Sequence, residues 1–366
     1  MAKLNMKITD ANKFFVFNAM DDWVRILDKN GKVVFVNNKM KEDVNNKENL
    51  GFDSLRDLTI GDQFNILKTT TVEEEKFIDG KFYSVKSSPI YFNEEFVGII
   101  EVYRDITGES KMKMDLFNAN RKMLDDIRFV RKIQSSILPK NKRYGQIKLQ
   151  GRYIPCNNLS GDLFDIVPIN YYKYAFYIAD VMGHGVKSSI MTMFVKLSLN
   201  AIFDKYQDYS PSQILKKLRE KFVGLKINSS QYFTIWLGIF NLKDDSLTFS
   251  NAGHNSSPIH LNVETNKTDI LEISGRMISN IIEASDYKEK KIKLNFNDKI
   301  LFYTDGVVES KGIEKDEYGI RRLEEKFKKE KNVDSILEDL SNFRWGEQSD
   351  DITLALIEYK EKNDED

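Results

Sequence analysis

The stretch LFYTDGVVES (residues 301–310) starts as an apolar strand and ends on a carboxylate, Asp305, which Gly306 follows in a turn. A carboxylate at the end of a buried strand lies close to the core, where an uncompensated charge is costly. The stretch contains no Arg or Lys that could neutralise it. Asp305 therefore requires a partner from elsewhere in the chain.

Other carboxylates occupy the same kind of position. Three stretches place Asp at the start or end of an apolar strand: Asp162 in SGDLFDIV, Asp180 in YAFYIADVMGHG, and Asp350 with Asp351 in SDDITLALIEY. Taken singly, each of these residues is explained better by a turn or a cap than by a functional role. Some of these strands have Asp at their end and others have Asp just before their start. If the two kinds run antiparallel to each other, the carboxylates gather at one edge of the sheet. We interpret this arrangement as a metal site, because divalent cations remove the repulsion.

The expected ligands also favour particular metals. Carboxylates, carbonyls and water suit Mg²⁺ or Mn²⁺. Zinc prefers His and Cys, and the chain has only three His and one Cys. Two ions about 3.5–4 Å apart can clamp a phosphoryl group and activate a water molecule. Such a pair of ions would suit in-line attack of water on a phosphoryl group.

Size and composition limit the other possibilities. A chain of 366 residues is long enough for two or three domains. A net charge of −1 gives no indication of nucleic-acid binding. The single cysteine, Cys156, excludes an intramolecular disulfide and fits a reducing cytosol. We see no signal peptide, and runs such as FTIWLGIF (233–240) are too short to span a bilayer. We expect a soluble cytoplasmic protein without direct membrane insertion, or one that only a partner holds at a membrane.

Residues 14–107 have the pattern of a small mixed domain. Short apolar strands flank a turn at 28–31 and another at Asp79-Gly80. The segment LDKNGKVVFVN, the late strand pair and the exit motif RDIT (104–107) resemble a PAS sensor domain. The resemblance implies ligand sensing or dimerisation. All His residues and Cys156 lie outside it, so we expect no His-ligated haem and no Cys-linked flavin.

Residues 108–138 read as one helix that ends before Pro139. Its heptad positions are Leu116, Asn120, Met123, Ile127, Val130, Gln134 and Ile137. This spacing favours a parallel coiled-coil homodimer, in which Asn120 and Gln134 would set the register. An amphipathic helix packed on its own domain is the alternative.

The C-terminal part predicts an α+β domain, largely antiparallel with helices packed outside the sheet. Strands are expected at 147–154, 163–169, 173–179, 232–240, 246–251, 290–296, 299–304 and 352–358. Helices are expected at 185–205, 211–223, 319–330 and 333–342, the second opening with the capping box Ser210-Pro211-Ser212-Gln213. The charged tail at 360–366 is expected to be frayed.

Seven motifs occur in the order seen in the PPM (protein phosphatase 2C-like) phosphatases, most similar to the bacterial SpoIIE/RsbU branch. They are SGDLFD, ADVMGHGVKSSIMT, FTIWLGIF, FSNAGHNSSP, LFYTDGVVES, DEYGIRRL and SDDITL. The resemblance covers about 125–359, with the domain itself at 139–359. It implies a β-sandwich with helices on both outer faces, two Mn²⁺ or Mg²⁺ ions, and hydrolysis of phosphoserine or phosphothreonine on proteins.

The resemblance also implies a set of metal ligands. Carried over by motif, they are Asp162, Asp180, the backbone carbonyl of Val181, Asp305 and Asp350, with Asp180 bridging both ions. Asp351 takes a supporting role only.

The sequence departs from the family pattern in three places. His184 lies two positions beyond the usual histidine, so we expect a structural role for it. We expect His254, in the NAGHN stretch, to be a structural histidine of a turn or loop. The loop 275–279 lacks the usual Pro and second Gly. No arginine matches the one expected for the substrate phosphate.

The branch implies a partner: a phosphorylated regulatory protein, often an anti-sigma-factor antagonist of the STAS type. A catalytically degenerate sensor or scaffold that binds a signalling partner is the alternative. A cysteine phosphatase is excluded, because the residue that should be Arg in a C-x5-R loop after Cys156 is Asp162.

Overall fold

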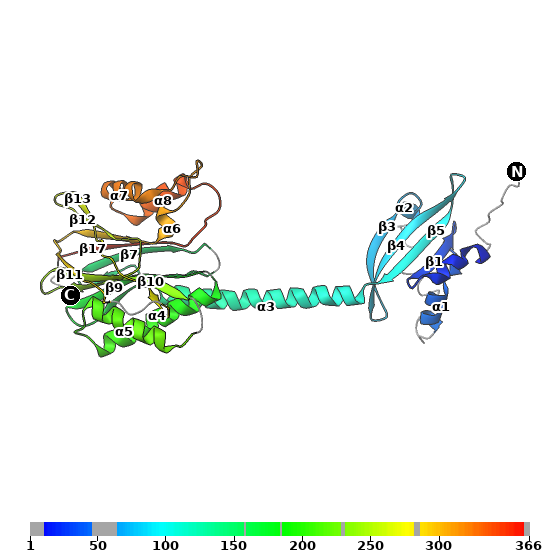
Figure 1. The fold of residues 1–366 in the computed structure, drawn as a ribbon. Helices are drawn as coiled ribbons and strands as arrows, with labels where there is room; N and C mark the ends of the chain where they lie inside the picture. Colours follow the sequence, from blue (N-terminus) through cyan, green and yellow to red (C-terminus); the bar gives the residue numbers. More distant parts are fainter. Residues whose placement is uncertain are drawn as a thin grey trace. The chain divides into compact units, whose positions relative to one another are not determined.

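The computed structural model describes residues 11–45, 64–156, 159–183, 185–227, 231–281 and 286–361. The chain divides into two compact units, Met1–Lys122 and Met123–Asp366. Both units mix helices with antiparallel sheet (Figure 1). The predicted α+β class is confirmed.

The first unit is built on a five-stranded antiparallel sheet with the order β2-β1-β5-β4-β3. Its strands are β1 (Trp23–Asp28), β2 (Val33–Val36), β3 (Val72–Ile78), β4 (Lys81–Phe92) and β5 (Glu95–Asp105). Its short helices are η1 (Ala11–Ala19), α1 (Asn38–Asn45) and α2 (Phe64–Leu67). Both predicted hairpin turns are confirmed, since β1 pairs with β2 and β3 pairs with β4. Much of the predicted domain's middle segment, 46–63, lies outside the described residues.

Helix α3 (Thr107–Ile137) confirms the long helix expected after this sheet. It starts where the Thr107 amide donates to the Asp105 carboxylate at 3.0 Å. Leu116 and Met123, at predicted heptad positions, are 62% and 55% exposed. Gln134 does not follow the prediction, because it is only 3% exposed and packs within its own unit. Its amide donates to the Ser160 carbonyl at 2.7 Å and accepts from the Ser160 amide at 3.3 Å, so it cannot set a coiled-coil register.

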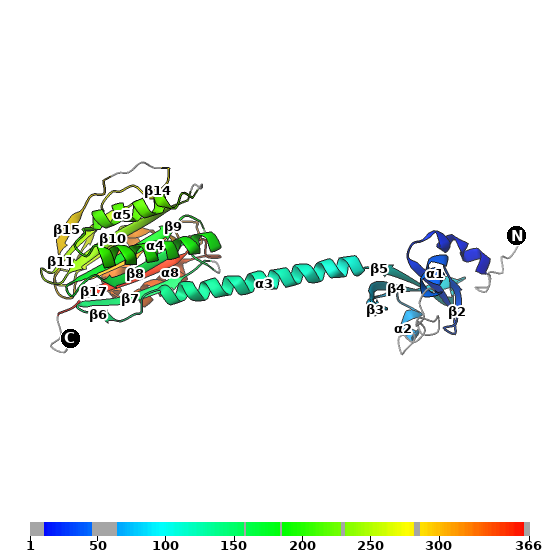
Figure 2. The ribbon, with the colours of Figure 1, turned by 90° about the horizontal axis from the view of Figure 1, so that it is seen from below.

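The second unit consists of two six-stranded antiparallel sheets between two pairs of helices (Figures 1 and 2). One sheet holds β8 (Asp162–Pro168), β9 (Lys173–Val181), β10 (Tyr232–Asn241), β11 (Ser246–Ala252), β14 (Ile278–Ser279) and β15 (Lys290–Lys293). The other holds β6 (Arg143–Tyr144), β7 (Ile147–Ile154), β12 (Ile259–Asn262), β13 (Lys267–Ile270), β16 (Lys299–Tyr303) and β17 (Ile352–Tyr359). The helices are α4 (Val186–Lys205), α5 (Pro211–Gly224), the short α6 (Asp305–Val308), α7 (Gly319–Glu330) and α8 (Val333–Phe343).

The layering explains why the central strands are apolar without interruption. Along β10, Ile235 and Leu237 pack in the core beneath α4 and α5, whereas Trp236 packs in the core between the two sheets. A third core joins β16 and β17 to α7 and α8. Strands covered on both faces need apolar residues at every position. The expected sandwich with helices on both outer faces is therefore confirmed.

Helix α4 is long and apolar enough to cross a membrane, by length and composition alone. Half of its most apolar window is buried, and Val195, Leu199 and Ile202 belong to the core under the sheet. These contacts are those of a core helix. At α5, the predicted capping box is confirmed: the Ser210 amide donates to the Gln213 side chain at 2.9 Å.

The sequence pattern did not reveal the short elements β6, β12, β13, β14 and α6. The strands among them have two to four residues, and β13 is polar and largely exposed at a sheet edge. Segments this short carry too few residues for periodicity to identify them.

We predict that Gln134→Ala lowers the free energy of unfolding of the second unit by about 1–3 kcal/mol, because the Ser160 backbone groups lose buried partners. Lys132→Ala, at an exposed position of the same helix outside the predicted heptad seam, is the matched control and should change it by less than about 0.5 kcal/mol. Urea unfolding followed by circular dichroism measures both values. Equal effects of the two substitutions would contradict the role of Gln134.

Candidate active site

The predicted carboxylates come together at one end of the sandwich. Strand β8 begins at Asp162 and β9 passes Asp180 near its end, and the antiparallel register makes these two residues direct neighbours. In the other sheet, Asp305 follows β16 and Asp351 precedes β17, and these two strands are also antiparallel neighbours. The four strand ends therefore meet as the sequence pattern requires.

Hydrogen bonds to Asp162 join the two sheets at this end. Its carboxylate accepts from the Thr304 hydroxyl at 2.8 Å and from the Thr353 hydroxyl at 2.5 Å. Asp162 is 3% exposed, and both threonines are fully buried. A buried carboxylate needs such donors to offset its lost hydration. The contact holds the Asp162 edge of one sheet against the β16–β17 edge of the other.

Asp305 lies directly against the segment that carries Asp350 and Asp351. A Cβ added at Gly306 would stand only 2.0 Å from the Asp351 carbonyl oxygen. Any side chain at this position would push the two segments apart, so the glycine after Asp305 is required by packing. The Asp305 carboxylate accepts from the Gly306 amide at 2.9 Å at the start of α6.

Asp351 holds the backbone that leads into Asp162. One of its carboxylate oxygens accepts from the Cys156 amide at 2.8 Å, and the other accepts from the Gly161 amide at 2.9 Å. Both oxygens are therefore engaged with backbone. This geometry suits the supporting role expected for Asp351 better than a role as a metal ligand.

Burial and then like charge raise the pKa values of the carboxylates at the site. Burial, and next the charges of Asp305, Asp350 and Asp351, raise the pKa of Asp180 to about 7. Burial and the neighbouring Asp180 hold the pKa of Asp162 well above its ordinary value. Burial and then Glu309 raise the pKa of Asp305. The protein alone does not neutralise these carboxylates.

The donor set fits a hard divalent cation. Carboxylate oxygens and the Val181 carbonyl, at the end of β9, are the ligands that Mg²⁺ and Mn²⁺ prefer. A cation would offset both the burial and the like charges that raise the pKa of Asp180. Within the described ranges, however, no three His, Cys, Asp or Glu side chains are grouped as a ready metal cage. The carboxylates of Asp162, Asp305 and Asp351 instead accept hydrogen bonds from hydroxyl or amide groups of the chain.

A cavity of about 550 Å³ opens beside Asp180 and Asp305. Its described lining comprises Asp180, Tyr232, Thr234, Gly253, His254, Asn255, Ser256, Gly275, Arg276, Met277 and Asp305. Arg276 supplies the positive charge among these residues, and its side chain is exposed. The Asn251 amide donates to the Ile273 carbonyl at 2.9 Å and so fixes the Arg276 loop against the 251–255 turn.

Arg276 was missed because no arginine occurs at the family's usual position. The signal was nevertheless present, since Arg276 lies in the loop 275–279 that departs from the family pattern. The end of that loop forms β14, which pairs with the start of β10. The loop 275–279 thus places Arg276 in the lining of the cavity that Asp180 and Asp305 also line.

His254 has the structural position expected for it. Its ring contacts the Thr234 hydroxyl at 3.3 Å and the Tyr303 carbonyl at 3.4 Å, and its backbone amide donates to Asn251 at 2.8 Å. Burial lowers the pKa of His254 to about 4. His184, for which a structural role was also expected, lies outside the described residues.

Residues 171–360, more than half of the chain, match the family model described as Stage II sporulation protein E (SpoIIE). The chain belongs to the SpoIIE family. Among curated proteins it is similar to phosphoserine phosphatase RsbP of Bacillus subtilis, with 28% identity over 190 residues, 50% of this chain and 45% of the relative. It is also similar to phosphoserine phosphatase RsbU of the same organism, with 26% identity over 156 residues, 43% of this chain and 45% of the relative. The match thus spans less than half the length of either relative.

Solved structures share the fold. The SiaA-PP2C domain of Pseudomonas aeruginosa superposes with a TM-score of 0.58 at 18% identity, covering 66% of this chain and 99% of that domain. The PP2C phosphatase domain of SpoIIE from Bacillus subtilis, with a fragment of its regulatory domain, gives 0.51 at 16% identity, covering 78% of this chain and 71% of that one. At these identities the likeness establishes the fold and nothing further.

We predict that acid destabilises the protein in part through His254. Burial lowers the pKa of His254 in the folded protein to about 4, from a value near 6.5 in the unfolded chain. The contribution of the neutral His254 to the free energy of unfolding is therefore fully present above pH 6.5 and is lost as the pH falls toward 4. At pH 5 the loss is about 2 kcal/mol relative to pH 8. His254→Gln should remove this component, measured as the difference between the urea-unfolding free energies of the two proteins in chelator at each pH. Parallel pH profiles would contradict the assignment.

Proposed function

We propose that the chain is a metal-dependent phosphatase that removes phosphate from serine or threonine of a regulatory protein. The observation that carries this proposal is the convergence of carboxylates from both sheets beside a cavity that also presents Arg276. Membership of the SpoIIE family supports it, as do relatives that are phosphoserine phosphatases.

The metals in this proposal are two Mn²⁺ or Mg²⁺ ions. Their ligands would be Asp162, Asp180, the Val181 carbonyl, Asp305 and Asp350. When bound, such ions polarise phosphoryl oxygens and lower the pKa of water. The raised pKa of Asp180 supports the assignment, because it marks a buried carboxylate among like charges that the chain itself leaves uncompensated.

The chain's own residues bind and orient in this scheme. Arg276 would bind the substrate phosphate through charge-assisted hydrogen bonds, which arginine forms in a forked geometry. Thr304 and Thr353 hold the Asp162 carboxylate in one orientation. Asp351 keeps the segment before Asp162 in place through two backbone amides.

In this proposal, the N-terminal domain and helix α3 regulate the phosphatase. The five-stranded antiparallel sheet, with α1 and α2 between β2 and β3, supports a PAS-like sensor domain at 14–107. The exposed apolar side chains Leu116, Phe117 and Met123 on α3 support a homodimer through the linker helix. The substrate in this scheme is a STAS-type phosphoprotein, and the protein acts in the cytoplasm.

We predict that Asp305→Asn lowers phosphate release from a phosphorylated STAS protein by about 100-fold or more with Mn²⁺ present. The amide keeps the shape but loses the charge that a cation needs. Asp269→Asn, an exposed carboxylate on β13, is the matched control and should retain activity. Full activity of folded Asp305→Asn would exclude this site. A wild-type protein that binds its partner without releasing phosphate would instead identify the degenerate scaffold.

We predict that Arg276→Met lowers kcat/KM for the phosphoprotein by about 10–100-fold, because a charged hydrogen bond to phosphate is lost. Arg276→Lys should recover part of the loss, since it keeps the charge without the fork. Lys329→Met, on the exposed surface of α7, is the control. Unchanged kcat/KM in Arg276→Met would show that the substrate phosphate does not contact this arginine.

A further inference from the structure

A second cavity, of about 380 Å³, lies at the opposite end of the sandwich from the carboxylates. Three hairpin turns surround it: β6–β7, β8–β9 and β10–β11. In the register of β9 with β10, Lys173 pairs with Asn241 at this end and Asp180 pairs with Thr234 at the other. Most of β9, on the order of 20–25 Å of extended chain, separates the two cavities. This site is therefore distinct from the proposed active site.

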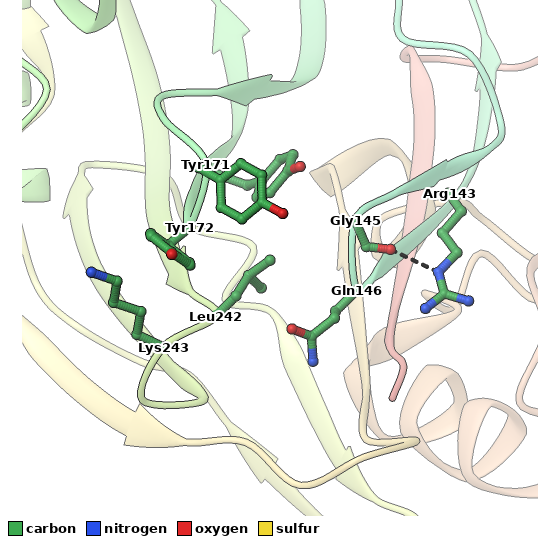
Figure 3. Close-up of a pocket in the computed structure, with 8 residues that line it drawn as sticks. Arg143, Gly145, Gln146, Tyr171, Tyr172, Leu242 and Lys243 are labelled. Atoms are coloured by element: carbon green, nitrogen blue, oxygen red, sulfur yellow. Dashed lines mark hydrogen bonds between the residues drawn. The ribbon is translucent and has the colours of Figure 1, made fainter. Parts of the chain in front are cut away.

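Tyrosine rings form one wall of this cavity. Tyr171, Tyr172 and Tyr174 all line it, and Tyr171 is 74% exposed. The rings of Tyr171 and Tyr172 meet edge to face with centroids 4.9 Å apart. Figure 3 shows Tyr171 and Leu242 on one side and Gly145 with Gln146 on the other. Exposed ring faces of this kind offer stacking surfaces to a planar group.

Gly145 sets the distance between the hairpins that form the cavity. A Cβ at this position would stand 3.0 Å from the Tyr174 hydroxyl and 3.4 Å from a Leu242 methyl carbon, and its φ is +57°. Both the contact and the left-handed backbone favour glycine. The β6–β7 turn can therefore approach the tyrosine wall closely enough to close one side of the cavity.

The charged side chains among the described lining residues, Arg143 and Lys243, are both basic. The Arg143 guanidinium donates to the Gly145 carbonyl at 2.7 Å and to the Glu361 carbonyl, which are neutral acceptors. The Lys243 ammonium lies 4.2 Å from the centroid of the Tyr172 ring. Neither cation forms an ion pair with a carboxylate in the part of the chain that the structure describes. Two uncompensated cations favour an anionic ligand.

We propose that this cavity binds a small planar aromatic anion of the nucleoside monophosphate class. The ring would stack on Tyr171, the more exposed ring, and the phosphate would pair with Lys243. Aromatic stacking would use the tyrosine rings of the lining, and an ionised phosphate would use its basic side chains. The volume lies at the lower end of the range for small-molecule sites, about 300–1,000 Å³. The inference does not depend on the proposed phosphatase activity.

The test is isothermal titration of the full chain, in chelator, with AMP and GMP. We expect saturable binding of at least one nucleotide. Adenosine or guanosine, and ribose 5-phosphate, should each bind about tenfold more weakly or worse, because each lacks either the phosphate or the ring. Tyr171→Ala and Lys243→Glu should weaken nucleotide binding by about tenfold, and Tyr171→Phe should preserve it.

Two control variants separate this site from others. Lys329→Glu, at an exposed position on α7, should bind the nucleotide as wild type does. Asp305→Asn should do the same, because it alters only the carboxylate end. The proposal is overturned if neither nucleotide shows saturable binding at millimolar concentration, or if ribose 5-phosphate binds equally well. It is also overturned if Tyr171→Ala and Lys243→Glu leave the affinity unchanged.

Discussion

The proposed active site depends on the buried carboxylate of Asp162, which accepts hydrogen bonds from two threonine hydroxyls. Thr304 and Thr353 belong to the β16–β17 side of the sandwich, and Asp162 begins β8 in the other sheet. Because Asp162 and Asp180 are register neighbours, this contact also fixes where Asp180 lies relative to Asp305. Without these donors, a carboxylate with almost no exposure would destabilise the junction between the sheets.

Gathering like charges is tolerated because apolar packing anchors the strands that carry them. β9 and β10 are covered by helices on one side and by the second sheet on the other, so their ends cannot easily move apart. Burial, and next the neighbouring carboxylates, raise the pKa of Asp180 as a result. The fold thus supplies a frame whose charged edge offers the carboxylate oxygens that divalent cations prefer.

The two ends of the sandwich differ in how their turns are built. At the carboxylate end, backbone amides bind Asp351 and Asp305, and the Asn251 side chain fixes the loop that carries Arg276. At the other end, three hairpin turns meet around tyrosine rings and two cations. Turns vary more readily than the strands that they join, so both cavities can acquire individual chemistry on one shared frame.

The local sequence determined the long apolar strands, the uninterrupted helix α3 and the carboxylates at the strand ends, because periodicity and turn residues act between near neighbours. Tertiary structure alone decided that Thr304 and Thr353 bind Asp162, that Gln134 packs on Ser160, and that Arg276 reaches the carboxylate cavity. These contacts join residues distant in the chain, and no local pattern encodes them. The short edge strand β13 also escaped prediction, since its four residues are held by pairing with β12 rather than by their own propensity.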